Sequence, residues 1–513
     1  MSLTKTGTAD STAKPAIDGT TADVELQAGA VSPVTGHADE LRREFSVWSL
    51  GALLVCLMAT WEALSSVVAQ ALTNGGAPSA SLAEIASIYP TAGGQYHWVA
   101  SLAPSHTRLV ASWFTGWINI GGQVVLTASA AFAAGLQFQA LIVLNDASGT
   151  YVPQRWQGMM FYWVVIAYST AINIFGSRIL PHTNTLSGIG HVVGFIATVL
   201  VLGIMGIGKE GGHSASYVFK EVDNTSGWSN DGVSWMVGLL SAVYPFLGYD
   251  AAAHLAEELP NPSRSVPIAM IGSIVVNGLM GLIYCLVLLF ALGDLSSLLA
   301  SPTGFPFMQL FLNVTHSRAG ATILALFISL IAMAANAAGT TSTSRTAWAF
   351  ARDRAAPCSA YFAHVDERSQ VPLRMVLATA ALQALLGFVY LASATAFNAV
   401  LSMAVLGMYA SYILPVAYML AYGRKEEDDT ATKITPAFTL GAWGPWVNAA
   451  SVAWLAVAMV FSTFPSVRPV TPQNMNYSVV VLGGWVAAGA VYYFGWARRW
   501  YEGPVVVVDG FGS

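Results

Sequence analysis

Eleven long apolar segments constrain the fold of this chain more than any other feature. They cover residues 46–72, 109–143, 157–176, 186–208, 232–258, 267–292, 319–350, 372–393, 397–422, 443–464 and 477–495. An α-helix needs about 20 mostly apolar residues to cross the hydrocarbon of a bilayer, whereas the strands of membrane barrels are about half that length. The sequence therefore predicts an all-α integral membrane protein surrounded by lipid.

Composition excludes several other classes of protein. The chain is 55% hydrophobic and 10% charged, whereas a soluble domain carries about 25% charged residues. Its basic residues are too few and too scattered for a nucleic-acid surface. The cysteines Cys56, Cys285 and Cys358 are far apart, which favours neither a disulfide framework nor a metal site. We expect no cofactor and no enzymatic activity, because no nucleophile–base spacing stands out.

The two ends of the chain differ from the apolar region between them. Residues 1–44 are rich in Thr, Ala, Gly, Asp and Ser, which predicts a disordered tail. Residues 496–513 follow the last apolar segment and are interpreted as a second tail. Residues 45–495 then form one polytopic domain. We expect both tails to be cytoplasmic.

Lysine and arginine favour cytoplasmic loops and so indicate orientation. If residues 98–108 are cytoplasmic, 17 of the 22 basic residues lie inside and 5 outside. If 73–108 is instead an outer loop, only 9 lie inside and 13 outside. The glycosylation sequons at Asn224, Asn313 and Asn476 fall in outer loops under the first assignment. The chain must therefore cross the membrane between Leu72 and Trp98.

The stretch between Leu72 and Trp98 is too short and too polar for such a crossing. A helix rises 1.5 Å per residue and the hydrocarbon core is about 30 Å thick. Several serines and Glu84 lie between Pro78 and Pro90. Only the cytoplasmic end of a second span is present. We expect strain where it joins the first span, and an empty groove among its neighbours.

Six motifs occur in the order found in one known family. They are "SLAEIASIYPTAGGQYHW" (81–98), "WFTGWINIGGQ" (113–123), "INIFGSRILP" (172–181), "AVYPFLGYDAAAHLAEELPNPSRSVP" (242–267), "SPTGFPFMQLFLN" (301–313) and "RTAWAFARDRAAP" (345–357). With the spans between them, they resemble the fungal amino-acid/choline transporter family. These proteins are GABA-permease-like members of the amino acid–polyamine–organocation superfamily. The resemblance covers about residues 45 to 500.

The resemblance implies a LeuT-like fold of twelve spans, built as two inverted five-helix repeats and two further helices. Members of the family carry a further stretch of apolar residues between "NGGAP" and "SLAEI", where this chain has almost none. Span 2 is thus largely missing, which leaves about eleven full spans. A lost exon or gene-model error is one explanation, and a real deletion that inactivates the protein is the other. Spans are numbered below as in the twelve-helix family.

In this fold the substrate would bind near the midplane, where spans 1 and 6 are broken. Span 1 offers Ala59, Thr60, Trp61 and Glu62 at this position. Span 6 offers Phe246, Leu247, Gly248, Tyr249 and Asp250. Pro245 removes a backbone hydrogen-bond donor there, and Gly248 can adopt backbone conformations that other residues disfavour. These nine residues are the predicted substrate contacts from the two broken spans.

Two of these residues are acids inside apolar runs. Burying an ionisable group in the membrane costs free energy, so we expect such a group to have a function. Glu62 could bind a substrate amine, or take up the coupling proton once burial raises its pKa. Alternatively, Glu62 is a structural carboxylate that caps local backbone groups. Asp250 is either a substrate contact or the N-cap of the second half of span 6. Trp61 and Tyr249 could close over a cationic amine, or simply pack.

Further polar residues have two interpretations each. Gln123 in span 3 and Asn336 in span 8 are site groups or interhelical hydrogen-bonding residues. Span 5 lacks the lysine that proton-coupled relatives often place there. His191 in this span can titrate near neutral pH, although we expect it to be structural. On the cytoplasmic side, inner-gate ion pairs or ordinary solvated loop charges are predicted at Glu84, Glu257, Glu258, Arg345 and Arg352.

These features together predict a secondary active transporter for amino acids or related amines such as GABA. We expect proton-coupled uptake by alternating access, in a monomer that lies in the plasma membrane rather than the vacuolar membrane. The alternatives are a choline- or polyamine-type amine transporter, a non-transporting nutrient sensor, and an inactive truncated product.

Overall fold

The computed structural model describes residues 41, 45–65, 76–175, 179–208, 212–221, 224, 226–423 and 436–504, and it is all-helical there. Nine helical stretches in these residues are long and apolar enough to cross a bilayer. They are α5 (Arg108–Asn145), α6 (Arg155–Phe175), α7 (Leu180–Val201) with the π-helical turn η2 (Leu202–Ile207), α11 (Pro262–Ala291), α14 (Arg318–Arg352), α16 (Leu373–Ala392), α17 (Ala394–Leu401) with α18 (Met403–Ala421), η5 (Gly441–Trp443) with α19 (Gly444–Phe461), and α20 (Ser478–Gly495).

The other two predicted spans are broken helices, as the resemblance implied for spans 1 and 6. Span 1 consists of α1 (Val47–Met58) and α2 (Thr60–Ser65), separated by Ala59 in the left-handed conformation with φ 41°. Span 6 begins as α9 (Asp231–Val243) and the 3₁₀ turn η3 (Tyr244–Phe246). After a non-helical stretch it continues as α10 (Ala251–His254) and η4 (Ala256–Glu258). The predicted all-α class and LeuT-like architecture are confirmed.

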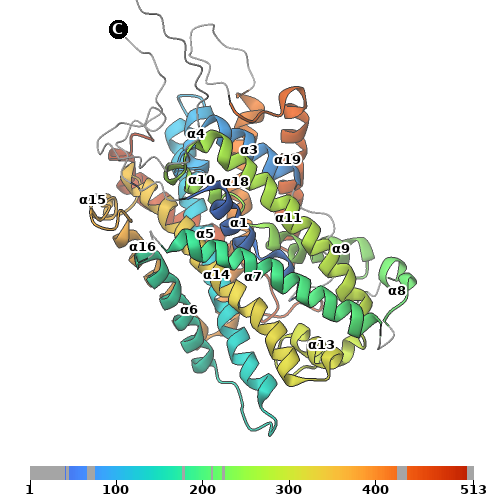
Figure 1. Ribbon diagram of the computed structural model, residues 1–513. Helices are drawn as coiled ribbons and strands as arrows, with labels where there is room; N and C mark the ends of the chain where they lie inside the picture. The colour runs from blue at the N-terminus through green and yellow to red at the C-terminus, as the bar shows by residue number, and fades with distance from the viewer. Residues whose placement is uncertain are drawn as a thin grey trace, which may run out of the picture.

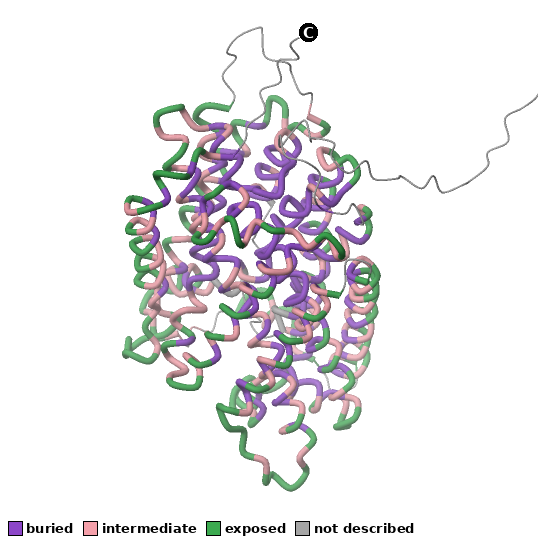
Figure 2. The backbone as a smooth tube through the Cα atoms, turned by 90° about the vertical axis from the view of Figure 1, so that its left-hand side faces the viewer, coloured by how far each residue is buried: buried purple, intermediate pink, exposed green. Residues whose placement is uncertain are grey.

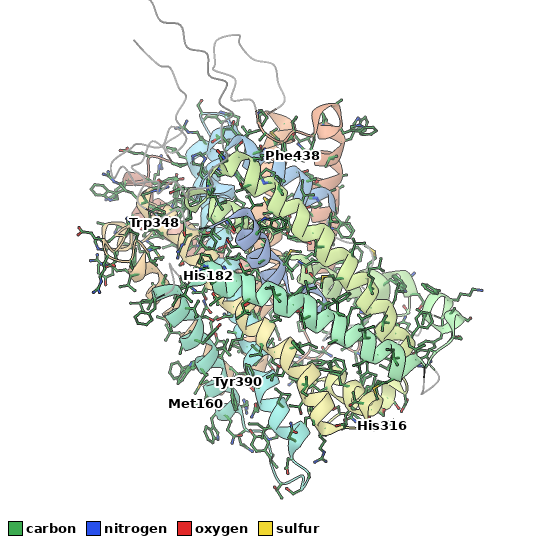
Figure 3. All side chains as sticks on the ribbon, viewed as in Figure 1. Met160, His182, His316, Trp348, Tyr390 and Phe438 are labelled. Atoms are coloured by element: carbon green, nitrogen blue, oxygen red, sulfur yellow. The ribbon has the colours of Figure 1, made fainter. Side chains whose placement is uncertain are left out.

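Short helices lie at the two ends of the bundle. In Figure 1, α4 (Gln95–Leu102) lies at the upper end close to α10, and α15 (Ser359–Phe362) lies at the left edge beside α16. At the other end, α13 (Pro306–Thr315) lies at the lower right and α8 (Ala215–Lys220) at the right edge, with α12 (Leu295–Leu299) preceding α13 in the chain. Trp348 and Phe438 mark the upper end and His316 the lower end in Figure 3. The predicted orientation places the upper end in the cytoplasm.

The remnant of span 2 is α3 (Gly76–Ile88), which has 13 residues. At 1.5 Å per residue it is about 20 Å long and cannot cross a 30 Å core. It packs against α11 and α19 at the cytoplasmic end. The Ser81 hydroxyl lies 2.8 Å from that of Ser451, and Ser87 donates to the Ser263 carbonyl at 2.8 Å. The predicted strain concerns residues 66–75, outside the described residues, so it and the empty groove remain predictions.

Apolar side chains cover much of the outer surface of the bundle. Figure 2 shows buried residues along its interior and exposed residues on its outer faces and loops. On α7, Leu186, Ile189 and Leu200 are all more than half exposed. A surface of this kind is stable against lipid rather than water, because it buries apolar area in the bilayer. At the end of the chain, Ala497 and Tyr501 are buried. The packed region thus extends beyond its predicted limit at residue 495.

Two glycines let α5 and α18 approach closely in the centre of the bundle. A Cβ atom on Gly122 would lie 3.0 Å from both the carbonyl carbon of Gly407 and the backbone nitrogen of Met408. Small residues permit such backbone contact between membrane helices. Because backbone atoms cannot move aside as side chains do, position 122 has no room for a side chain.

We expect Gly122→Val to separate α5 from α18 and to lower stability by about 1–3 kcal/mol, the usual cost of overpacking. Thermal unfolding in detergent, followed by fluorescence-detected size-exclusion chromatography, would measure the loss. Gly484→Ala on α20 is the control, since a Cβ there meets no atom within 4 Å. Equal melting temperatures for the two variants would contradict the assigned contact.

Candidate functional site

The breaks in spans 1 and 6 meet at one point inside the bundle. The buried Thr60 hydroxyl donates to the carbonyl of Pro245 at 2.9 Å. In span 6, Gly248 has φ 95°, a conformation that side chains disfavour, and its N–H donates to the Tyr412 hydroxyl at 3.4 Å. Broken helices leave backbone groups without intrahelical partners. Here these groups are partly satisfied by the opposing break and by α18.

Glu62 faces His191 beyond the first break. Oε1 of Glu62 lies 2.7 Å from Nδ1 of His191, and the two side chains are 2% and 0% exposed. The contact lacks the angles of a hydrogen bond, and neither carboxylate oxygen nor imidazole nitrogen has another hydrogen-bond partner among the described residues. The alternative for Glu62, a local backbone cap, is not formed among the described residues. His191, which we expect to be structural, lies directly against this acid.

Asp250 forms the centre of a buried hydrogen-bond network. Oδ1 accepts from the Tyr412 hydroxyl at 2.6 Å, and Oδ2 accepts from Nε2 of Gln95 at 2.7 Å. Nε2 of His254, one helical turn on, lies 3.2 Å from Oδ2. Asp250 precedes α10, but its side chain makes no capping hydrogen bond. The N-cap interpretation is therefore wrong. The carboxylate instead connects α10 to α4 and α18.

Gln123 extends this network across α5. Its Nε2 lies 3.2 Å from Oδ1 of Asn119 and 2.9 Å from Nε2 of His254, while its Oε1 accepts from Thr346 at 3.2 Å. Nδ1 of His254 lies 3.0 Å from the carbonyl of Ala92, so it must carry a proton. A neutral His254 accepts from Gln123, whereas a protonated one donates to Asp250. The histidine can thus exchange one partner for the other.

Asn336 occupies a different place from Gln123. Its Nδ2 donates to the carbonyl of Thr127 at 2.8 Å and to Oε1 of Gln383 at 3.3 Å. These bonds join α14 to α5 and α16, which favours the interhelical interpretation over substrate contact. Gly339, one turn further along α14, lies on the cavity beside Gln123 instead.

A small cavity lies beside the break in span 6. Its volume is about 10 Å³, room for about one water molecule. The residues around it are Leu57, Gln123, Leu126, Thr127, Gly248, Asp250, Ala251, Gly339, Ser342, Thr343 and Met408. Typical small-molecule sites measure about 300–1,000 Å³. This cavity among the described residues is therefore too small to hold a substrate molecule.

The aromatic side chains of the two breaks have different neighbours. The Trp61 ring packs against His191, Phe195 and Tyr284, with centroids 5.3–6.0 Å apart. Tyr249 packs against Tyr412 at 5.1 Å. Trp61 thus lies in a hydrophobic cluster between α7 and α11, whereas Tyr249 lies against α18. They do not form the expected pair over a cation in this conformation. Phe246 and Leu247 are buried in the main core.

Four of the five predicted gate residues form two ion pairs between span 6 and α14. Arg352 binds Glu257 through both terminal nitrogens, at 2.8 and 2.9 Å. Arg345 binds Glu258 at 2.7 Å, and this arginine is 2% exposed. Solvated loop charge is therefore the wrong interpretation for these groups. Glu84 instead accepts from the backbone N–H of Leu440 at 2.8 Å, which ties α3 to the segment before α19.

The three sequon asparagines differ in accessibility. The side-chain amide of Asn224 donates to the carbonyl of Trp228 at 2.8 Å, and that of Asn476 donates to the carbonyl of Ser462 at 2.7 Å. Asn313 is exposed, and its amide oxygen accepts from Gln309 at 2.8 Å. Of the three predicted glycosylation sites, Asn313 offers the most available amide nitrogen.

Sequence reasoning missed several members of the Asp250 network. His254 follows Asp250 by four residues, a spacing that places both on one face of a helix and could have indicated the pair. Gln95, Asn119 and Tyr412 carry no such signal, because they come from three other helices. Only the tertiary structure brings Gln95 and Tyr412 to the Asp250 carboxylate, and Asn119 to the side-chain oxygen of Gln95.

The positive φ of Gly248 predicts that a side chain at this position lowers the stability of the protein. We expect Gly248→Ala to lower stability by about 1–2 kcal/mol, because left-handed conformations disfavour a Cβ. That atom would also lie 3.2 Å from Leu57. Unfolding in detergent would measure the change, with Gly272→Ala on α11 as the control, where a Cβ meets nothing within 4 Å. A neutral Gly248→Ala variant would contradict the described break.

Comparison with known proteins agrees with this architecture. The amino acid permease family matches residues 46–485. An uncharacterized amino-acid permease of Schizosaccharomyces pombe is 32% identical over 498 residues, covering 92% of this chain and 89% of its own. The choline transporter of Saccharomyces cerevisiae is 29% identical over 469 residues, covering 88% and 81%. Amino-acid permease 2 of Neurospora crassa is 30% identical over 525 residues, covering 98% and 94%.

The fold is also reflected in these similarities. MhsT, solved in complex with L-phenylalanine, shares the fold with a TM-score of 0.55 and 15% identity, covering 82% of this chain and 98% of its own. This chain belongs to the amino acid permease family, and it is a membrane transport protein rather than an enzyme.

Proposed function

We propose that this chain is a proton-coupled secondary transporter that imports an amino acid or a related amine such as GABA. The observation that carries the proposal is the buried contact between Glu62 and His191 beside the meeting point of the two broken helices. The names of the relatives, amino-acid permeases and a choline transporter, support an amine-bearing substrate. The protein acts as a monomer in the plasma membrane.

The charge of the Glu62–His191 pair explains how coupling works. With the histidine neutral and the carboxylate ionised, the pair carries one buried negative charge, which is costly at membrane depth. One proton, or the ammonium group of a substrate, neutralises it. When the proton from outside occupies Glu62, the pair is neutral and the substrate amine binds instead to the backbone carbonyls at the helix breaks, so both are carried inward together. Release of both to the cytoplasm restores the original state.

Choline transport is the second candidate, because a named choline transporter covers most of this chain. Choline has a quaternary ammonium group and no carboxylate, so the aromatic residues and Glu62 alone would have to recognise it. GABA has a carboxylate as well, which requires a donor elsewhere in the site. An uptake panel of GABA, choline and common amino acids distinguishes the two candidates.

The ion pairs at the cytoplasmic end act as the inner gate. Glu257 and Glu258 follow α10, and their partners Arg352 and Arg345 lie at the end of α14. Inward opening moves span 6 away from α14 and must break both pairs. Their strength therefore sets how readily the closed conformation opens.

We expect Glu62→Gln to abolish accumulation driven by a pH gradient, because the neutral amide cannot carry a proton. The variant is built in a chain with span 2 restored from a relative, and uptake of labelled GABA is measured in vesicles at several pH values. Glu221→Gln, an exposed glutamate after α8, is the control. Normal gradient-driven uptake by Glu62→Gln would refute the proposed proton site.

The inner gate makes a second prediction. Removing one partner of a buried ion pair costs about 3–5 kcal/mol, because the other charge is left unpaired. In the restored chain, Glu257→Gln should therefore shift the protein toward the inward-open form. Cysteine accessibility along α10 would report the shift. The exchange of both charges, Glu257→Arg with Arg352→Glu, should restore part of the closed population. No recovery would show that the pair is not a gate.

Because span 2 is shortened, the alternative is that this chain is an inactive product. We expect transport only after the missing segment is restored, since α3 alone is too short to cross the membrane. Side-by-side uptake by the chain as it stands and by the restored chain tests this. Binding of substrate without flux in the restored chain would instead favour the nutrient-sensor alternative.

A further inference from the structure

A large cavity at the cytoplasmic end has no role in the transport site. Its volume is about 950 Å³, within the range of small-molecule sites. It lies between the turn that follows α14, the short helix α15, and the last turns of α20 with the 3₁₀ turn η6 (Ala497–Arg499). Arg352, Arg354, Cys358, Tyr492, Trp496 and Trp500 contribute to its wall. None of the described residues that line it is acidic.

Arg352 contributes positive charge to the wall of this cavity. Its two terminal nitrogens bind Glu257, and its guanidinium lies 4.5 Å from the centroid of the Trp348 ring. Its Nε is buried, so the side chain acts on the cavity through its charge and not through a hydrogen bond. That charge favours an anion in the cavity.

Further positive charge surrounds the opening. Arg354 lies on the cavity wall, is exposed, and forms no ion pair with any described residue. Arg498 and Arg499 are exposed on η6. Trp496 and Trp500 are 62% and 65% exposed. Tryptophan is enriched where membrane meets water, and basic pockets on the cytoplasmic side favour anionic headgroups.

We propose that this cavity binds the phosphate headgroup of an anionic phospholipid. The exposed guanidinium of Arg354 binds the phosphate, and the nearby charge of Arg352 favours it. Tyr492, Trp496 and Trp500 contact the less polar part of the lipid. Free inorganic phosphate shares the charge but lacks the apolar part. The aromatic wall and the position at the membrane boundary therefore favour the lipid.

Binding there would act on the inner gate, a consequence that rests on the proposed function. The negative charge of a phosphate in the cavity competes with Glu257 for the positive charge of Arg352. The pair that holds span 6 to α14 is thereby weakened. Anionic lipid should favour inward opening and raise the rate of transport.

Cys358 provides a direct test of binding. It is the exposed cysteine of the three and lies on the cavity wall, while Cys56 and Cys285 are buried. The full chain is reconstituted in phosphatidylcholine vesicles with or without phosphatidylserine, and its labelling by N-ethylmaleimide is timed. This reagent is neutral, so the surface potential does not change its local concentration. Because labelling follows the empty fraction, occupancy of nine sites in ten should slow it about tenfold.

Arg354→Gln should remove most of this protection, and Arg368→Gln should retain it. Arg368 is exposed in the loop between α15 and α16 and does not line the cavity, so it matches the charge change. Equal labelling in both lipids would overturn the proposal. An equal loss of protection in both variants would also overturn the proposal, because general attraction of the anionic lipid to basic surface residues would then explain the effect. Protection by inorganic phosphate in phosphatidylcholine vesicles would overturn the assignment to a lipid.

Two further measurements separate folding and function from binding. Labelling of more than one thiol per chain would identify unfolded protein, because two cysteines are buried in the native fold. In the restored chain, phosphatidylserine should raise the rate of substrate exchange for wild type but not for Arg354→Gln. Cys358 protection without any transport would refute the proposed function and leave the lipid site standing. Transport without protection would refute the lipid site alone.

Discussion

The hydrogen bond from Thr60 to the carbonyl of Pro245 joins the two broken helices on which the candidate site depends. Inside a bilayer, every exposed backbone group must find a partner in the protein. A break in one helix is therefore tolerated where another break, a side chain or water satisfies it. The left-handed residues Ala59 and Gly248 allow the chain to change direction at this point. Glu62 and Asp250 follow these residues closely, so the buried acids and the breaks form one region.

The two acids are satisfied in different ways. Asp250 has donors from Gln95 and Tyr412 and a histidine beside it, so its carboxylate is held between α4, α10 and α18. Glu62 has only the close approach of His191 among the described residues. A fully bonded carboxylate suits a structural connection, whereas a poorly satisfied one suits a group that gains a proton or a substrate. This contrast is the physical basis for giving Glu62 the coupling role.

Helix α14 connects the proposed gate at its end to the helices packed around its middle. Its Arg345 and Arg352 bind the glutamates that follow α10, and Asn336 near its middle bonds to α5. Movement of span 6 relative to α14 is therefore a movement of charges as well as helices. Arg352 also contributes to the wall of the cavity at this end of α14. A lipid bound there would be linked to the gate through one side chain, with no need for a longer pathway.

Much of this protein could be predicted from its sequence. The apolar runs reproduced the spanning helices, because a lipid-exposed helix needs length and apolarity and little else. Pro245 and Gly248 located the break in span 6, and the family motifs indicated the fold. Charge pairing at the end of span 6 was one of two interpretations of the sequence, since acids and arginines lay on the same predicted side. The contacts of Asp250 were not, because they come from helices far apart in sequence.

By itself, the sequence determined which segments are long and apolar enough to enter the membrane, and that span 2 is too short to cross. These properties depend on local composition and length. The tertiary structure alone decided that His191 faces Glu62, that Trp61 and Tyr249 are separated, and that Arg352 both binds Glu257 and lines a cavity. These contacts depend on how helices rotate and pack against one another. Residues that are distant in the chain carry no local sequence signal of that packing.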